Sequence, residues 1–168
     1  MTKDNNSENE LARYAIEVRR RINECDGEVF RNKSARHASI ILREFIESAK
    51  ESVFVFCGQL NRLVYGDLLD SFTKVVEEEK QVRVVIEGDY AAASEVASYL
   101  TSKGALRRLR KDVGIPHFVV VDAIRYRLEI DECDKSALVC AYAKTEEQQY
   151  RAQALNAVSE ILWDAAQS

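Results

Sequence analysis

Proline and glycine are scarce in this sequence: among 168 residues there are one proline and six glycines. A chain so poor in both is neither a flexible linker nor a low-complexity segment. It also lacks a run of about 18 apolar residues, which excludes a membrane-spanning helix. The first ten residues are polar and contain no apolar signal-peptide core, so we expect a cytoplasmic protein.

Residues that usually bind metals are few as well. The chain has four cysteines, namely Cys25, Cys57, Cys133 and Cys140. They form no CxxC pair, and only two histidines, His37 and His117, could join them. This spacing argues against a zinc site, and we expect neither a metal nor a cofactor. In a reducing compartment the thiols stay free, and we expect them to be structural.

The common catalytic and nucleotide-binding motifs are absent. The sequence contains no GxGxxG or GxxxxGK[ST] phosphate loop, no HExxH zinc motif and no GxSxG nucleophile turn. It has no acidic cluster at EF-hand spacing either. A catalytic activity would therefore have to use residues outside these motifs.

The composition is that of an ordinary globular domain, with 46% hydrophobic and 31% charged residues and a formal net charge of −4. A chain of this length forms one domain with its own core. We expect a polar tail and an N-terminal helical arm over residues 1–27, and a single domain over residues 28–168. The net negative charge argues against a polycation built for nucleic acid.

Apolar periodicity predicts an alternation of helices and strands. The expected helices span residues 11–25, 34–49, 68–79, 92–103 and 146–166. The expected strands span residues 52–57, 81–86, 106–110, 118–121, 125–130 and 137–143. Strands that alternate with helices favour an α/β fold, here with a mixed, mostly parallel sheet flanked by helices. In the last helix, the candidates for packing include Tyr150, Ala154, Ala157, Ile161 and Trp163.

One family resemblance extends from about residue 34 to residue 166. The stretches SVFVFCGQL, LLDSFTKVVEE and VRVVIEG are similar to the opening strand, helix and strand of the phospholipase D-like (HKD) family. The stretch DVGIPHFVVVDAIRYRLE stands where that family has its signature strand, and ALVCAYA and EILWDAA are similar to its last strand and closing helix. The resemblance implies a single phospholipase D-like domain.

The resemblance also implies a damaged catalytic motif. The family's strand reads HxKxxxxD and is followed by GSxN; the histidine attacks phosphorus, while the lysine and asparagine hold the phosphate oxygens. Alignment of the apolar strand places Asp122 on the aspartate, His117 on the lysine and Ile115 on the nucleophile. Residues 129–132, which include three acids, fall near GSxN. Carboxylates there would repel a phosphodiester.

A second alignment matches His117 to the motif histidine. It puts Val119 at the lysine and Ile124 at the aspartate, so two catalytic roles are empty in either alignment. His117 and Asp122 are therefore catalytic candidates only if the protein is active. We favour a structural role for His117, with a hydrogen bond to Asp122 or to the backbone, because a lone histidine cannot stabilise a pentavalent phosphorus.

Candidate ligand-binding residues follow the strands. In an open α/β sheet, ligands bind beyond the carboxyl ends of the strands, which points to residues 58–61 and 87–89. Gln59 and Asn61 would line a pocket there or satisfy the turn.

Basic residues gather between residues 103 and 127, where seven bases stand against two acids, whereas residues 128–168 hold eight acids and three bases. The basic stretch could meet a phosphate backbone, or pair internally with the acidic one. Its candidate ligand-binding residues are Arg107, Arg108, Arg110, Arg125 and Arg127.

These features lead to one preferred hypothesis and two alternatives. The preferred function is that of a pseudoenzyme, a phospholipase D-like binding or regulatory module that acts with nucleic acid or a nucleic-acid-processing partner, for example in phage defence or in a mobile-element system. The resemblance implies a homodimer. The first alternative is an active phosphodiesterase or nuclease with a remodelled His117 centre in a dimer. The second is a protein–protein adaptor whose helical arm over residues 11–25 docks on a larger enzyme.

Overall fold

The computed structural model describes residues 3–32, 34–87, 95–110, 113–131 and 136–167. Its helices are α1 (Lys3–Asn23), α2 (Ala35–Glu47), α3 (Arg62–Tyr65), α4 (Leu69–Glu77), α5 (Glu95–Ser102) and α6 (Glu146–Ala165). Its strands are β1 (Val29–Asn32), β2 (Ser52–Cys57), β3 (Gln81–Glu87), β4 (Leu106–Leu109), β5 (Phe118–Val121), β6 (Arg125–Asp131) and β7 (Ser136–Cys140). Of the predicted features, Gly88, Asp89, Lys111 and Cys133 lie outside the described residues.

The strands form one sheet in the order β1-β7-β6-β5-β2-β3-β4. β3 pairs in parallel with β2 and with β4, and the four other pairings are antiparallel. The expected α/β class and single domain are confirmed, but the expected excess of parallel pairs is wrong. Helices connect β2 to β3 and β3 to β4, whereas only residues 122–124 join β5 to β6, and so short a connection allows only a hairpin.

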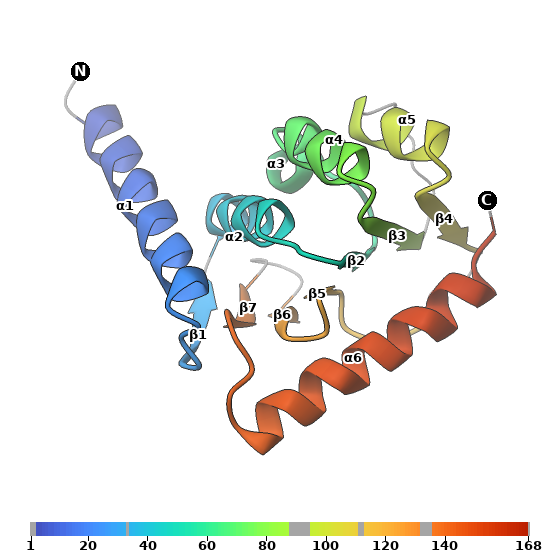
Figure 1. The fold of residues 1–168 in the computed structure, drawn as a ribbon. Coiled ribbons are helices and arrows are strands. Elements are labelled where there is room, and N and C mark those ends of the chain that lie inside the picture. The colour runs from blue at the N-terminus through green and yellow to red at the C-terminus, as the bar shows by residue number, and fades with distance from the viewer. Residues whose placement is uncertain (1–2, 33, 88–94, 111–112, 132–135, 168) are drawn as a thin grey trace.

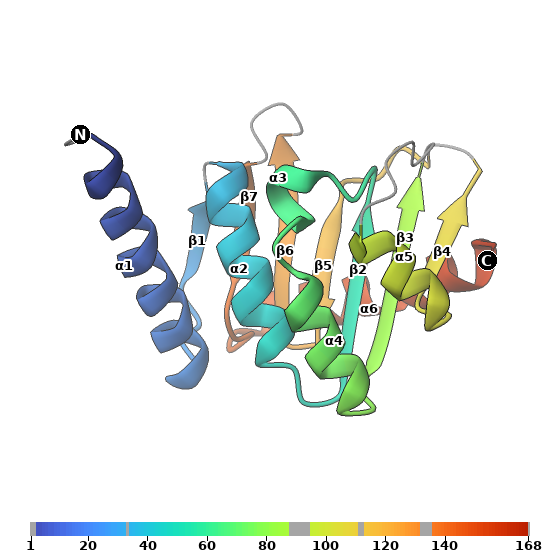
Figure 2. The same ribbon diagram turned by 90° about the horizontal axis from the view of Figure 1, so that it is seen from above.

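Helices cover both faces of the sheet (Figure 1). The larger core lies between the sheet and α2, α4 and α5, and it includes Leu42 and Phe72. A second core lies under α6, where Trp163 packs with Phe118. Figure 2 shows α2 to α5 in front of the strands, α1 beside β1 at the edge of the sheet, and α6 behind the strands. Within the described ranges, no helix combines the length and the hydropathy that a membrane crossing requires.

The N-terminal helix α1 packs along α2. Val18 and Ile22 of α1 are buried, and Arg19 forms a two-pronged ion pair with Glu44 of α2 at 2.7 and 2.8 Å. The helix begins at Lys3, whereas the sequence predicted a polar tail up to residue 10. Apolar periodicity detects only a helix face that is buried, so the two polar turns over residues 3–10 give no signal.

The last helix, α6, packs with a different face from the one expected. Of the predicted packing residues only Trp163 is buried. The other four are exposed to solvent, namely Tyr150, Ala154, Ala157 and Ile161. The buried side carries Ala152, Ser159 and Leu162 with Trp163. Apolar residues lie on both sides of this helix, and the side with adjacent Leu162 and Trp163 removes more apolar surface from water.

Candidate functional site

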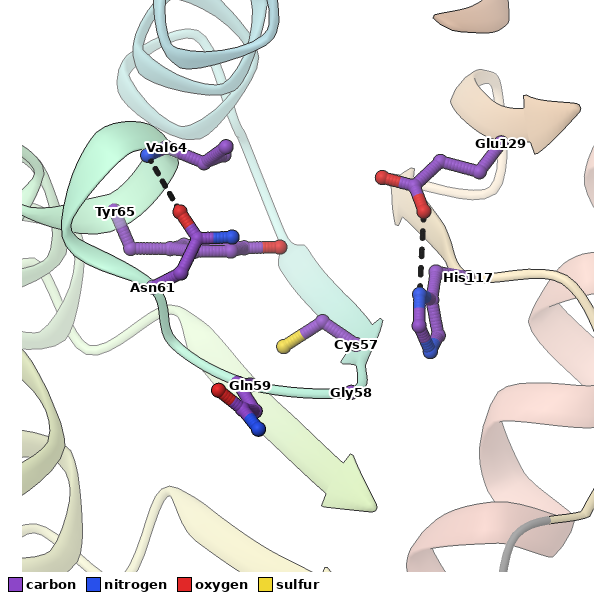
Figure 3. Close-up of a pocket in the computed structure, with 8 residues that line it drawn as sticks. All are labelled: Cys57, Gly58, Gln59, Asn61, Val64, Tyr65, His117 and Glu129. Carbon is purple, nitrogen blue, oxygen red and sulfur yellow. Dashed lines mark hydrogen bonds and ion pairs between the residues drawn. The ribbon is translucent and has the colours of Figure 1, made fainter. Parts of the chain in front are cut away.

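A pocket of about 280 Å³ lies at the carboxyl end of β2 (Figure 3). β5 runs antiparallel to β2, with Phe118 opposite Phe56, so the start of β5 meets the end of β2. His117 immediately precedes β5 and therefore lies beside the loop that follows β2. The pocket is formed by this loop, by Tyr65 of α3 and by His117 and Glu129.

His117 is held from both sides by carboxylates. Its Nδ1 lies 3.1 Å from Oε2 of Glu129, and its Nε2 lies 3.1 Å from Oε1 of Glu87. The ring is buried and meets Phe56 edge-on. Gly58 makes room for it, because a Cβ at this position would lie 3.0 Å from the imidazole Cε1. The imidazole is thus fixed in position and in orientation.

The hydrogen bonds also favour the doubly protonated state of His117. Ionised carboxylates only accept hydrogen bonds, so an imidazole bonded through both nitrogens to glutamates carries a proton on each. The bond to Glu129 is the largest cause that raises the pKa of His117; burial opposes it and the bond to Glu87 adds to it. In this state the ring has no free lone pair and can be neither a nucleophile nor a general base.

The two carboxylates are bonded to further groups. Oε1 of Glu129 accepts from a terminal nitrogen of Arg127 at 3.2 Å, and Nε of Arg127 donates to Oδ1 of Asn32 at 3.1 Å. Oε2 of Glu87 accepts from the backbone N–H of Val113 at 3.2 Å. Among the described residues, this network joins two cations, the imidazolium and Arg127, to two anions, Glu129 and Glu87. The charges of these four groups balance.

The two predicted loop residues both line the pocket. Oδ1 of Asn61 accepts from the backbone N–H of Val64 at 3.0 Å and so caps α3, while Gln59 is exposed. In Figure 3 the hydroxyl of Tyr65 is directed into the pocket, and the sulfur of Cys57 points away from His117 toward the Tyr65 side. Burial raises the pKa of Tyr65 well above its ordinary value. In the described parts of the chain, no three His, Cys, Asp or Glu side chains are arranged to hold a metal ion.

Asp122 lies at the opposite end of β5 and does not reach the pocket. Its carboxylate accepts hydrogen bonds of 2.8 to 3.2 Å from the backbone N–H groups of Lys50, Glu51 and Ser52. It also accepts from Arg125 at 2.9 Å. Burial raises the pKa of Asp122, but the backbone donors and the Arg125 charge outweigh it and lower the pKa. Asp122 therefore ties the loop before β2 to the β5–β6 turn.

The five predicted ligand-binding arginines do not form one surface. Arg125 and Arg127 are buried and bonded to carboxylates. Arg107 and Arg108 are half-buried on β4, and Arg110 is exposed. The guanidinium of Arg107 lies 4.0 Å from the ring centre of Trp163 and donates to its carbonyl at 2.8 Å. Arg110 follows β4, at the sheet edge where β2 and β3 also end.

The sequence indicated His117 as a site residue but did not predict the carboxylates that bind its ring. The sequence indicated Glu87 only as the first residue of a candidate ligand-binding segment, and Glu129 only as an acid where the family has GSxN. The hairpin register was the available signal, because a turn at residues 122–124 pairs Phe118 with Leu128. That register puts the next pair, His117 and Glu129, side by side, and the backbone N–H of Glu129 donates to the carbonyl of His117 at 2.9 Å.

Comparison with known proteins shows a shared fold but identifies no family. No protein-family model matches the chain, and no curated protein matches it. TrmBL2, an archaeal chromatin protein whose structure shows a novel mode of DNA binding, superimposes with a TM-score of 0.62 and 13% identity over 83% of this chain and 52% of that one. NucT from Helicobacter pylori gives a TM-score of 0.55 and 13% identity over 84% of this chain and 99% of that one. The chain thus spans about half the length of TrmBL2.

Proposed function

We propose that this protein is a non-catalytic phospholipase D-like module that acts with nucleic acid. The observation that carries the non-catalytic part is the state of His117, which is bonded through both nitrogens to Glu129 and Glu87. A histidine that attacks phosphorus needs an unprotonated nitrogen aimed at the substrate. His117 has none, and the alignment that makes His117 the motif lysine leaves Ile115 as the nucleophile.

The charges of the pocket also oppose phosphodiester chemistry. The imidazolium of His117 and the guanidinium of Arg127 are the cations of this network, and Glu129 accepts from both. A phosphate that bound both cations would displace Glu129, which would separate that buried carboxylate from His117 and Arg127. Separating a buried ion pair in this way costs several kcal/mol. The network is better suited to holding the sheet edge together than to binding an anion.

Hydrolysis of a generic phosphodiester tests the non-catalytic part. Bis(p-nitrophenyl) phosphate is incubated with the wild-type protein and with His117→Ala, each with and without Mg²⁺ or Mn²⁺. We expect no release of p-nitrophenolate above the protein-free blank in any sample. Turnover by the wild type that is lost in His117→Ala would instead establish the remodelled phosphodiesterase.

Two observations support the nucleic-acid part. The fold is shared with TrmBL2, whose structure concerns DNA binding, although only the fold is shared at this identity. In addition, the carboxyl edge of the parallel strands presents exposed Gln59 and Arg110. β2 and β4 lie two strand spacings apart, about 10 Å, so one stretch of nucleic-acid backbone can span both positions.

Salt-dependent binding tests this part. The affinity for a short DNA duplex is measured by fluorescence anisotropy over a range of salt concentrations, with wild type, Arg110→Ala and Lys50→Ala. Lys50 is also exposed, but it lies at the opposite edge of the sheet. We expect the logarithm of the affinity to fall linearly with the logarithm of salt. Arg110→Ala should reduce the slope by about one unit, and Lys50→Ala should leave it unchanged.

The binding of nucleic acid and the location of its contact surface can each be contradicted separately. Wild-type protein without any salt-dependent binding at low ionic strength would rule out nucleic acid as the partner. Equal losses in Arg110→Ala and Lys50→Ala would rule out the carboxyl edge as the contact surface.

A further inference from the structure

Exposed apolar side chains concentrate in two places on this molecule. Among the described residues, four large hydrophobic side chains are more than 60% exposed: Leu63 (78%), Tyr150 (75%), Ile161 (68%) and Ile16 (67%). Tyr150 and Ile161 lie on α6. Leu63 lies on α3 and lines a groove between α1, α2 and α3, and Ile16 lies on α1. This grouping differs from the scattered exposed hydrophobics that are normal on a protein surface.

On α6 the exposed apolar residues form a continuous line, which we call the α6 stripe. It consists of Tyr150, Ala154, Ala157 and Ile161, all exposed. Spacings of four, three and four residues place them on one side of a helix, opposite the side that packs on the sheet. Glu147 lies three residues before the stripe and Asp164 three residues after it. The stripe is therefore apolar in its middle and carries a carboxylate at each end, of which Glu147 also pairs with Arg151 at 2.9 Å.

The second surface is a groove of about 590 Å³ between α1, α2 and α3, which we call the arginine groove. Its lining includes the apolar side chains of Leu11, Ile40 and Leu63. It also includes three arginines, Arg36, Arg43 and Arg62, and a single acid, Asp67. None of the three arginines forms a salt bridge with a described carboxylate; Arg43 donates a long 3.4 Å hydrogen bond to a backbone carbonyl. The groove is therefore apolar with a basic border.

We propose that the α6 stripe of one copy of this protein docks in the arginine groove of a second copy. The two surfaces are complementary: their apolar side chains would meet in the middle, and the carboxylates of the stripe would meet the guanidinium groups at the border of the groove. The contact cannot form within one chain, because α6 and the groove lie on opposite faces of the sheet (Figure 1). The proposal is independent of nucleic-acid binding.

The charges also disfavour the simplest rival contact, in which two α6 stripes pair with each other, although Arg151 lies beside Glu147 on the same helix. An antiparallel pair centred on the stripe would place Glu147 against Asp164 of the other copy. A parallel pair would place each acid against its own equivalent. Like charges facing each other destabilise a helix pair, whereas the groove presents three arginines to the same acids.

Docking of this kind has a structural consequence. The contact joins two different surfaces, so each copy that docks still offers one free stripe or one free groove. Such head-to-tail association continues until it closes into a ring or forms an open chain. The assembly should therefore grow beyond a dimer as the protein concentration rises.

Complementation between two broken surfaces tests the proposal. The groove variant carries Arg62→Glu and Leu63→Asp, the stripe variant carries Ile161→Asp, and Ile130→Asp is the control outside both surfaces. All four positions are exposed, and thermal unfolding verifies that each variant is folded. Sedimentation velocity at low salt then measures the association of each variant and of mixtures.

We expect the wild type and Ile130→Asp to form species larger than a dimer as concentration rises, and added salt to weaken them. Each surface variant alone should lose about tenfold or more in association constant. An equimolar mixture of the two should form a heterodimer and nothing larger, because one intact stripe and one intact groove remain.

Three results would overturn the proposal. The first is a wild type that stays monomeric up to about 1 mM. The second is a groove variant that still associates as the wild type does, which would indicate pairing between stripes. The third is a mixture of the two variants that fails to associate.

Discussion

The two ends of β5 hold the two residues that the family motif would make catalytic partners, and they differ in what they stabilise. At one end, Asp122 gathers three backbone N–H groups and Arg125, and so joins two loops. At the other end, His117 sits in a pocket as a cation between two carboxylates. Five residues of strand separate them by about 17 Å. At both ends the charged side chains are bonded to other described groups, so both motif positions contribute to the stability of the fold.

The largest effect should come from breaking the Asp122 end. Asp122→Ala removes the acceptor of three backbone N–H groups and leaves the buried Arg125 without its carboxylate. We expect a loss of about 3 kcal/mol in the free energy of unfolding, measured by urea denaturation. Asp122→Asn keeps one acceptor oxygen and should lose about half as much. A loss within about 0.5 kcal/mol, typical of a surface site, would contradict the assigned role.

The ion pairs of His117 should make the free energy of unfolding depend on pH. The native pKa of His117 is raised above its ordinary value of about 6.5, so the folded state keeps a proton that the unfolded state releases. The stabilisation is complete below about pH 6.5 and is lost as pH rises through the native pKa. The free energy of unfolding should fall with a slope of up to about 1.4 kcal/mol per pH unit.

A neutral replacement isolates this effect. The amide in His117→Gln can still donate to Glu129, but it does not titrate, so the slope between about pH 6.5 and pH 8 should flatten. Urea denaturation of both proteins across this window provides the comparison. Wild-type stability that rises with pH here would mean that His117 is neutral in the folded protein.

The sequence predicted most of the fold, because its core strands are dense apolar runs. β2 and β5 have almost every residue buried, and their predicted bounds match. β1 was missed because only its last residue is buried, so it is not a dense apolar run, and α3 was missed because a single helical turn is too short to show a 3.6-residue period. The packed face of α6 could not be predicted because both of its sides carry apolar residues.

The site was only partly predictable, for a related reason. Each member of the His117 network comes from a different part of the chain: Glu87 ends β3, His117 precedes β5, and Glu129 lies on β6. Charge counting suggested that the basic stretch could pair internally with the acidic one. The Arg127–Glu129 bond is one case of this, but composition cannot show which partners meet.

The smallest effect concerns backbone strain at the two ends of β5. Near His117 the residue with positive φ is Gly114 (65°), whereas at the other end Asp122 and Ala123 both have a φ of 53°. An alanine in this region is strained by about 1 kcal/mol, and the entropy cost of glycine offsets part of that. Ala123→Gly should therefore raise the free energy of unfolding by about 0.5 kcal/mol, whereas Gly114→Ala should lower it by about 1 kcal/mol. Urea denaturation measures both, and a loss of stability in Ala123→Gly would mean that the Asp122 network already relieves the strain.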